Sequence, residues 1–400
     1  MVLEEYRVHV EGPLERWARG FATALVGQGF TRLSICVKLR LLADASRWLE
    51  SRGLLARQLT PERVEQLIIS RRRRRYTASL SVRALAPMMK YLREVGAAPV
   101  ARESSAMNYV DRVVGRYQYY LVNERGVGGR TVKQRSGFAL IFLARHKSDP
   151  SIRTIGAGEI RQFIRRKTQG LSVNHAKTVA NSLRSLLRFL HVIGLVPWPL
   201  VGAVPSVCGW RLQGVPKFVP KESVRKMLRS CDRLTLTGAR DFAVLNLLIR
   251  LGLRKCEVVS LELEDINWRQ GEIVVRGKGK SVSRLPLPYD VGDAISAYLS
   301  RRPTVAFRSV FLLKPAPRKP ITPSSIASIV ELASLRAGLK PVSPHKLRHT
   351  LATEVLRRGG SLAEVAELLR HKSLGTTAIY AKVDRTALRE LAQPWPGGAL

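Results

Sequence analysis

The chain has 400 residues, of which 68 are Lys or Arg and 30 are Asp or Glu, so its formal net charge is +38. The length allows two to four domains, and a hydrophobic content of 45% excludes wholesale disorder because ordinary cores can form. So large a positive excess favours nucleic acid as the partner, since a polyanion relieves the self-repulsion of the chain.

An anionic membrane is the competing explanation for the charge. The sequence has no apolar stretch long enough to span a bilayer, and residues 1–12 carry too many charges for a signal peptide. The four cysteines are widely spaced, without the pairs typical of a zinc finger or a disulfide framework. We therefore expect a soluble cytoplasmic protein with reduced thiols and no membrane partner.

Apolar patterns in the first half recur about 100 residues further along the chain, which suggests an internal repeat. Residues 66–68 match 162–164, and residues 85–96 match 183–194, where the shared glycine ends the last helix of each unit. Apolar residues at intervals of three and four predict amphipathic helices. We predict two tandem helical bundles, the first a possible duplicate of the second.

Pro and Gly residues crowd the segment 197–218 and exclude a continuous helix there. The sequence thus predicts four parts: an N-terminal bundle at 1–98, a second bundle at 99–196, a linker at 197–218, and a last domain at 219–400.

The last domain is predicted to be mostly helical with a small antiparallel sheet. A helix over 239–251 stops at Gly252, and strands at 272–276 and 282–287 flank a hairpin tip at 277–280.

Two further helices of this domain have clear start signals. Ser343–Pro344 opens a helix that ends at Gly359–Gly360, and Ser361 with Glu364 forms a capping box for a short helix.

The last domain also holds cations, imidazoles and a phenol, without a carboxylate cluster for a divalent metal. Guanidinium groups bind the nonbridging oxygens of a phosphodiester bidentately and stabilise charge in its transition state. A phenol can act as nucleophile, and an imidazole can take its proton. The residues concerned are Arg254, Lys278, His345, Arg348, His371 and Tyr380.

Four blocks give these residues a familiar order: 251–257, 277–280, 345–350 and 368–380. In order and spacing they resemble the tyrosine recombinase (phage integrase) family. The resemblance implies a mainly α fold with a small antiparallel β-sheet in the catalytic domain. It also implies a two-armed DNA clamp, with residues 99–196 as the core-binding arm and residues 1–98 as an additional N-terminal helical bundle.

The resemblance assigns the bond-making steps to three residues. Tyr380 is the nucleophile that forms a 3′-phosphotyrosyl bond, His345 is the general base toward it, and Lys278 protonates the departing 5′-oxygen.

The resemblance assigns phosphate binding to Arg254 and Arg348, which clamp the nonbridging oxygens, and to His371, which donates a hydrogen bond. Glu257 orients the site. The phosphotyrosyl ester between protein and DNA retains the energy of the broken phosphodiester bond, so no metal and no cofactor are expected.

The sequence departs from the family pattern at three positions. Leu251 stands where Thr is common, Lys346 where Asp is common, and Arg370 where Gly is usual. None removes a catalytic side chain, but Arg370 alters the turn before His371.

Other readings of single motifs are weaker. His345 and His349 have the spacing of a zinc pair but lack the expected acidic partner and third ligand. The residues at 277–281 fail the phosphate-loop pattern because Val274 stands where Gly is required.

The run Arg71–Arg75 is either a solvated helix face or a nonspecific phosphate contact. The tyrosines of 117–120 read mainly as core.

The function implied is a site-specific DNA recombinase or integrase, the transposase of a mobile element. The extra bundle and the tail at 392–399 resemble recombinases clustered on bacterial mobile elements. The expected partners are double-stranded DNA, three further copies in a tetramer on synapsed DNA, and companion recombinases, in the bacterial cytoplasm at the nucleoid. The alternatives are a type IB topoisomerase-like enzyme and a DNA-binding protein that does not cleave.

Overall fold

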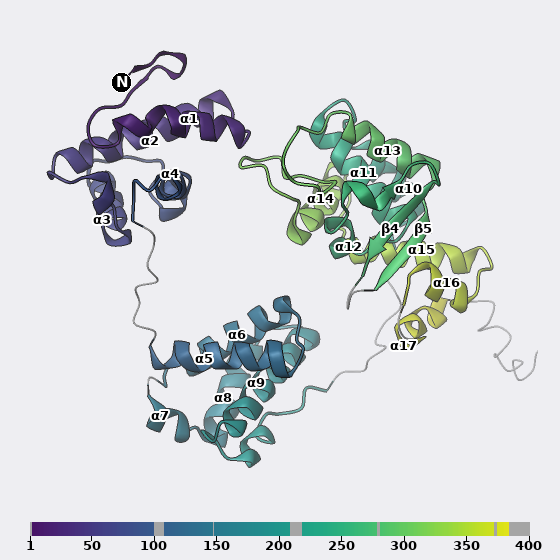
Figure 1. Ribbon diagram of the computed structural model, residues 1–400. Coiled ribbons are helices and arrows are strands. Elements are labelled where there is room, and N and C mark those ends of the chain that lie inside the picture. The colour runs from purple at the N-terminus through teal and green to yellow at the C-terminus, as the bar shows by residue number, and fades with distance from the viewer. Residues whose placement is uncertain are drawn as a thin grey trace, which may run out of the picture. The chain divides into compact units, whose positions relative to one another are not determined.

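The structure is a computed structural model that describes residues 2–99, 108–146, 148–208, 218–277, 281–371 and 374–383 (Figure 1). The chain divides into two compact units, residues 101–213 and residues 1–100 with 214–400. Lys278 lies outside the described residues, so its predicted role is not visible in the structure. Across the described ranges, no helix combines the length and apolar character needed to cross a bilayer.

The N-terminal part is a helical bundle preceded by a short hairpin. Thr31 and Ser81 accept hydrogen bonds from backbone N–H groups in the first turns of α2 and α4, which fixes where these helices begin. The elements are β1 (Val2–Leu3), β2 (Val8–His9), α1 (Ala18–Gly27), α2 (Arg32–Glu50), α3 (Pro61–Arg73) and α4 (Val82–Glu94).

The second bundle has its own hydrophobic core. The Pro- and Gly-rich segment contributes to it, because Val201 and Val204 are buried there after a short 3₁₀ turn. The elements are α5 (Tyr109–Tyr119), followed by a π turn (Tyr120–Glu124), α6 (Gly129–Leu143), α7 (Asp149–Arg153), α8 (Ala157–Thr168) and α9 (Val173–Val192).

The positions matched in the sequence repeat occupy similar places in the two bundles. The apolar residues of 85–92 on α4 and of 183–190 on α9 are core residues, and each helix ends at a glycine with positive φ, Gly96 or Gly194.

The C-terminal part is mainly helical with one three-stranded antiparallel sheet, as the sequence predicts. The central strand β4 pairs with β5 from Glu272 opposite Pro286 to Arg276 opposite Val282, and the two-residue strand β3 completes the sheet. The elements up to the sheet and just after it are α10 (Lys221–Arg229), α11 (Leu236–Arg250), α12 (Lys255–Val259), β3 (Ile266–Asn267), β4 (Glu272–Arg276), β5 (Val282–Pro286) and α13 (Tyr289–Leu299).

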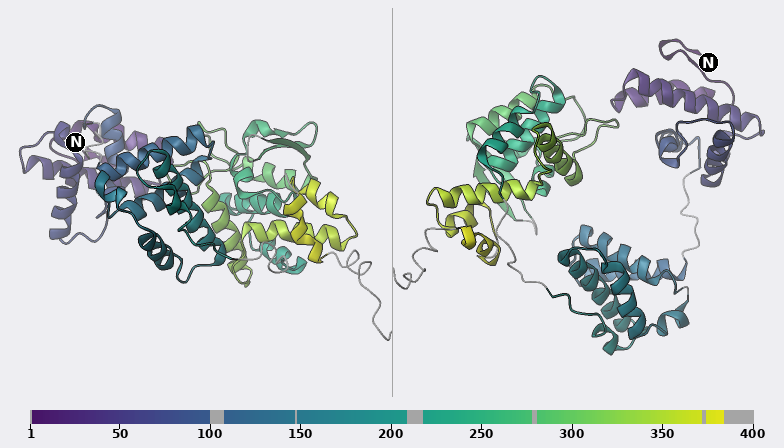
Figure 2. Two further views of the ribbon diagram at one scale, coloured as in Figure 1. Left: turned by 90° about the horizontal axis from the view of Figure 1, so that it is seen from below. Right: turned by 180° about the vertical axis from the view of Figure 1, so that it is seen from behind.

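Of the remaining helices of this part, α15, α16 and α17 lie side by side (Figure 2), with α15 packed against α11, whereas α14 packs against α10, α11 and α12. Ser343 caps α15, and Ser361 with Glu364 forms the capping box of α16, both as the sequence predicts. They are α14 (Pro323–Arg336), α15 (Pro344–Arg357), α16 (Leu362–Leu368), α17 (Leu374–Thr377) and the 3₁₀ helix η7 (Ala378–Val383).

The turn after α11 brings the backbone close to the last helices. Gly252 has φ +56°, and a Cβ on it would come within 2.9 Å of Leu351 and 3.0 Å of Leu369. A glycine is therefore required both by conformation and by space.

Candidate active site

Arg348 is the buried centre of the site. Its side chain projects from α15 and donates hydrogen bonds to the carbonyl oxygens of Gly252 and Leu369, so it joins the turn after α11 to the end of α16. Arg348 is 5% exposed. Burial, with the charges of Arg254 and Arg370, lowers its pKa to about 10, which still leaves it charged at neutral pH.

Arg254 is held by the carboxylate of Glu257, which is 3% exposed. At the start of α12, the Arg254 Nη1 donates to Glu257 Oε1 over 2.7 Å, and its backbone N–H donates to Oε2 over 2.9 Å. The backbone cap holds the Glu257 carboxylate in place, and the carboxylate in turn holds the Arg254 guanidinium. Burial raises the pKa of Glu257, but the Arg254 hydrogen bonds and the charges of Arg370 and Arg254 outweigh it, so the pKa lies below its usual value.

Arg370 adds a third guanidinium to this cluster. Its Nη2 donates to Glu257 Oε2 over 3.0 Å, although the two residues lie far apart in the sequence. The sequence indicated only an altered turn at this position.

Tyr380 lies on η7, packed among side chains of α15 and α16, and is 1% exposed. Its hydroxyl shares a 2.7 Å hydrogen bond with Nδ1 of His349. Burial raises the pKa of Tyr380 to about 12, against the lowering effect of Arg348. The phenol is thus protonated at neutral pH and needs a base to become a nucleophile.

The sequence predicts His345 as the general base toward Tyr380 and gives His349 no role in the chemistry. In the structure, the Tyr380 hydroxyl is hydrogen-bonded to His349 instead. His345 lies on the exposed start of α15, around a small hollow that Arg254 and Arg348 also line. Desolvation lowers the pKa of both imidazoles, and neighbouring positive charge lowers it further.

His371 links the end of α16 to α17, whose last residue directly precedes the 3₁₀ helix that carries Tyr380. Its Nδ1 shares a 2.8 Å hydrogen bond with the Thr377 hydroxyl, and its ring is nearly parallel to that of Tyr380, with 6.4 Å between centroids. Burial, followed by the charges of Arg348 and Arg254, lowers its pKa to about 4, so the ring is neutral at pH 7.

A cavity of about 260 Å³ opens beside these residues. Arg254, Arg370 and His371 line it, together with the ends of the β4–β5 hairpin at Gly277 and Ser281. The predicted Lys278 comes directly after Gly277 in the sequence and lies outside the described residues. Glu257 also lines the cavity, but it is paired with both Arg254 and Arg370, so the lining keeps a net positive charge and a neutral imidazole, which suit a phosphate group.

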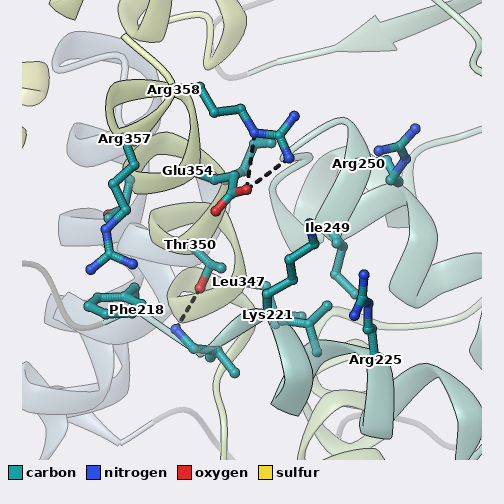
Figure 3. Close-up of a pocket in the computed structure, with 14 residues that line it drawn as sticks. Phe218, Lys221, Arg225, Ile249, Arg250, Leu347, Thr350, Glu354, Arg357 and Arg358 are labelled. Atoms are coloured by element: carbon teal, nitrogen blue, oxygen red, sulfur yellow. Dashed lines mark hydrogen bonds and ion pairs between the residues drawn. The ribbon is translucent and has the colours of Figure 1, made fainter. Parts of the chain in front are cut away.

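A second cavity, of about 250 Å³, lies between α10, α11 and α15 (Figure 3). The five described residues of the predicted site do not line it. Two of the cations that line it have partners there: the Arg357 guanidinium lies 4.1 Å from the Phe218 ring centroid, and Arg358 pairs with Glu354 over 2.8 Å. Its lining also includes apolar side chains, among them Val224, Ile249 and Leu347. We place the chemistry in the first cavity because Arg254 and His371 of the predicted site line it, whereas no described residue of the predicted site lines the second.

Among the described residues, no three His, Cys, Asp or Glu side chains gather in a way that holds a metal ion. The positive charge of the site comes from its guanidinium groups.

Two residues of the site were not predicted, His349 and Arg370. The sequence did carry a signal for His349, since it lies four residues after His345 on one helix and so near the same face. The signal for Arg370 was its departure from the pattern just before His371.

Comparison with known proteins gives the family of the chain. Residues 217–386 match the model of the phage integrase family. The protein y4rA of Sinorhizobium fredii (strain NBRC 101917 / NGR234), named as a candidate integrase or recombinase, is 37% identical over 398 residues, covering 97% of this chain and 96% of y4rA. The tyrosine recombinase XerD of Listeria monocytogenes serotype 4b (strain F2365) is 29% identical over 288 residues, covering 69% of this chain and 95% of XerD.

Among solved structures, the integrase of the Tn1549 transposon in complex with a circular intermediate DNA is similar in fold. Its TM-score is 0.52 at 16% identity, and the match covers 72% of this chain and all of that one.

The chain belongs to the phage integrase family, the tyrosine recombinases. It is a site-specific recombinase that cuts and rejoins DNA.

Proposed function

We propose that this protein recombines double-stranded DNA for a mobile element, with Tyr380 as nucleophile and Arg254 and Arg348 as the phosphate clamp. The observation that carries the proposal is the convergence of two fixed guanidiniums and the neutral His371 with the phenol, from segments more than a hundred residues apart. The mobile-element role is supported by the additional N-terminal bundle and by the tail at 392–399.

The buried hydroxyl sets a condition on the reaction. Tyr380 shares its hydrogen bond with His349 and does not line the 260 Å³ cavity, so η7 must shift for the oxygen to reach a phosphate there. In this proposal His345 or His349, both neutral at pH 7, takes the phenol proton. Lys278, at the hairpin tip, protonates the 5′-oxygen that leaves.

The clamp arms belong to the same proposal. Residues 99–196 are the core-binding arm and residues 219–400 the catalytic arm, with residues 1–98 as a further DNA-binding bundle. Exchange between two duplexes requires four active sites, so we propose a tetramer on synapsed DNA.

The test proceeds in two stages. The protein is first incubated with a random-sequence library of nicked duplexes, and the DNA ends trapped covalently are sequenced, which gives the target site. Two differently labelled duplexes carrying that site are then mixed with the protein. We expect the labels to exchange partners. Relaxation of supercoiled DNA without exchange would favour the topoisomerase-like alternative, and binding without any trapped ends would favour a protein that does not cleave.

A further inference from the structure

Arg370 is held in a backbone conformation that L side chains rarely adopt. It follows α16 directly, and its φ is +53°. Such a conformation persists where surrounding contacts hold it, and at functional sites the strain is often part of the mechanism.

The Arg370 side chain turns inward and is 13% exposed. Its Nη1 donates to the Leu368 carbonyl over 3.2 Å, and its Nη2 donates to Glu257. Its Nε is buried and has no hydrogen-bond partner among the described residues. A buried donor without a partner is unfavourable, so the position is not explained by the stability of the fold alone.

Glu257 connects Arg370 to the phosphate clamp. One oxygen of this carboxylate accepts from the Arg254 guanidinium, and the other accepts from both the Arg254 backbone and Arg370. The Arg370 carbonyl oxygen also lies 3.5 Å from Arg254 Nη2, within hydrogen-bonding distance. The side chain and the backbone of Arg370 therefore both act on Arg254.

The charge balance shows what Arg370 changes. With Arg348 nearby, three guanidiniums and one carboxylate leave this cluster a net charge of +2. Without Arg370, Glu257 would cancel half of the charge of the two clamp arginines.

We propose that Arg370 is a positioning residue for the scissile phosphate: it neutralises Glu257, so that the Arg254 guanidinium presents its positive charge to the phosphate. The inference rests on the proposed function. A phosphodiester gains negative charge as the phenol oxygen adds to phosphorus, and the net charge around it then determines the barrier.

The experiment compares variants on two substrates that carry the mapped cleavage site. One has the normal phosphodiester, and the other has a methylphosphonate at the scissile position, which removes the negative charge of that group. Single-turnover formation of the covalent adduct is measured at saturating protein, and the dissociation constant for DNA is measured separately.

Arg370→Gln keeps a hydrogen-bond donor for Glu257 but loses the charge. We expect it to cleave the phosphodiester about tenfold to a hundredfold more slowly, and to cleave the methylphosphonate at nearly the wild-type rate. Arg370→Lys keeps the charge and should retain most of the rate on both substrates. The matched control is Arg358→Gln, which removes a guanidinium from another Arg–Glu pair on an exposed surface and should change neither rate.

Arg370→Gly separates this role from a structural one. Glycine accepts a φ of +53° without strain, so the variant should unfold at a higher temperature than Arg370→Gln and still cleave the phosphodiester slowly.

Three results would overturn the inference. They are an Arg370→Gln variant as fast as wild type on the phosphodiester, an equal loss on both substrates, and an Arg370→Lys variant as slow as Arg370→Gln. Absence of any adduct on Tyr380 in the wild-type protein would instead overturn the proposed function, and this inference with it.

Discussion

The arginines of the catalytic site and those at the end of α3 use positive charge in opposite ways. Arg348 and Arg370 are turned inward, and carbonyl oxygens or a carboxylate fix their guanidiniums. The run Arg72–Arg75 is exposed. A fixed, desolvated charge acts on one phosphate at one place, whereas mobile surface charges attract any polyanion and are screened by salt. Substitutions in the first group should therefore impair chemistry, and substitutions in the second should impair binding.

Arg71 shows that neighbours in one run can belong to different groups. Its side chain is buried in an ion pair with Asp44, and its guanidinium lies 4.2 Å from the Tyr76 ring centroid. The sequence alone does not distinguish the five arginines of the run, but in the structure only the last four are exposed.

The largest effect is expected at Arg348. Arg348→Ala should slow adduct formation at least about a hundredfold to a thousandfold, because it removes a preorganised donor and leaves two buried carbonyls without their partner. Single-turnover cleavage is the measurement, with binding measured in parallel. Arg348→Lys is the control for charge alone, and it should recover little because an ammonium lacks the fork geometry. A cleavage rate within tenfold of wild type in Arg348→Ala would contradict its assignment.

Next in size is the loss of the ion pair inside the N-terminal bundle. Asp44→Ala leaves the Arg71 charge buried without a carboxylate and should lower the free energy of unfolding by about 3 kcal/mol. Urea denaturation of the full chain measures this effect. Arg74→Ala is the exposed control from the same run. If it is equally destabilising, the contrast between buried and exposed arginines is wrong.

A smaller effect is expected from the exposed run. Replacing Arg72–Arg75 with alanine should make the salt dependence of DNA binding shallower, by about 0.9 in the slope of log K against log salt for each arginine that contacts phosphate. The cleavage rate of protein already bound should stay unchanged. An unchanged slope would mean that this end of the bundle does not contact DNA.

The smallest effect concerns pH. Desolvation and neighbouring positive charge lower the pKa values of His345 and His349 from 6.5, so each ring gains its proton at a lower pH than a free imidazole does. The cleavage rate at saturating protein should thus fall as the pH is lowered and the base is protonated, with the midpoint of the decline below pH 6.5. A decline centred at 6.5 or above would show that the base is not in this desolvated, cationic setting. His349→Ala and His345→Ala, compared in the same assay, identify which ring is responsible.

The parts of the fold that the sequence predicts are those specified by local chemistry. Ser343 and Ser361 predict where two helices begin, and Gly252 predicts where one ends, because caps and positive φ depend on a few adjacent residues. The fold class and the β4–β5 hairpin are confirmed for the same reason. The third strand was missed because two residues, Ile266 and Asn267, give too short a pattern.

Contacts between distant segments were not predictable from the sequence. The His349–Tyr380 hydrogen bond joins α15 to η7, and the Arg370–Glu257 pair joins the turn after α16 to α12, so both depend on how these separate elements pack. Sequence order predicts which side chains are reactive, but it gives no information on which imidazole faces the phenol.

The most direct test of the central claim is to locate the covalent bond. The wild-type protein and Tyr380→Phe are incubated with a nicked duplex carrying the mapped site, digested with protease, and analysed by mass spectrometry for peptides that retain a nucleotide. We predict that the wild type gives one such peptide, with the 3′-phosphate on Tyr380, and that Tyr380→Phe gives none while binding DNA almost as tightly. A nucleotide attached to any other residue, or an adduct that persists in Tyr380→Phe, would contradict the account.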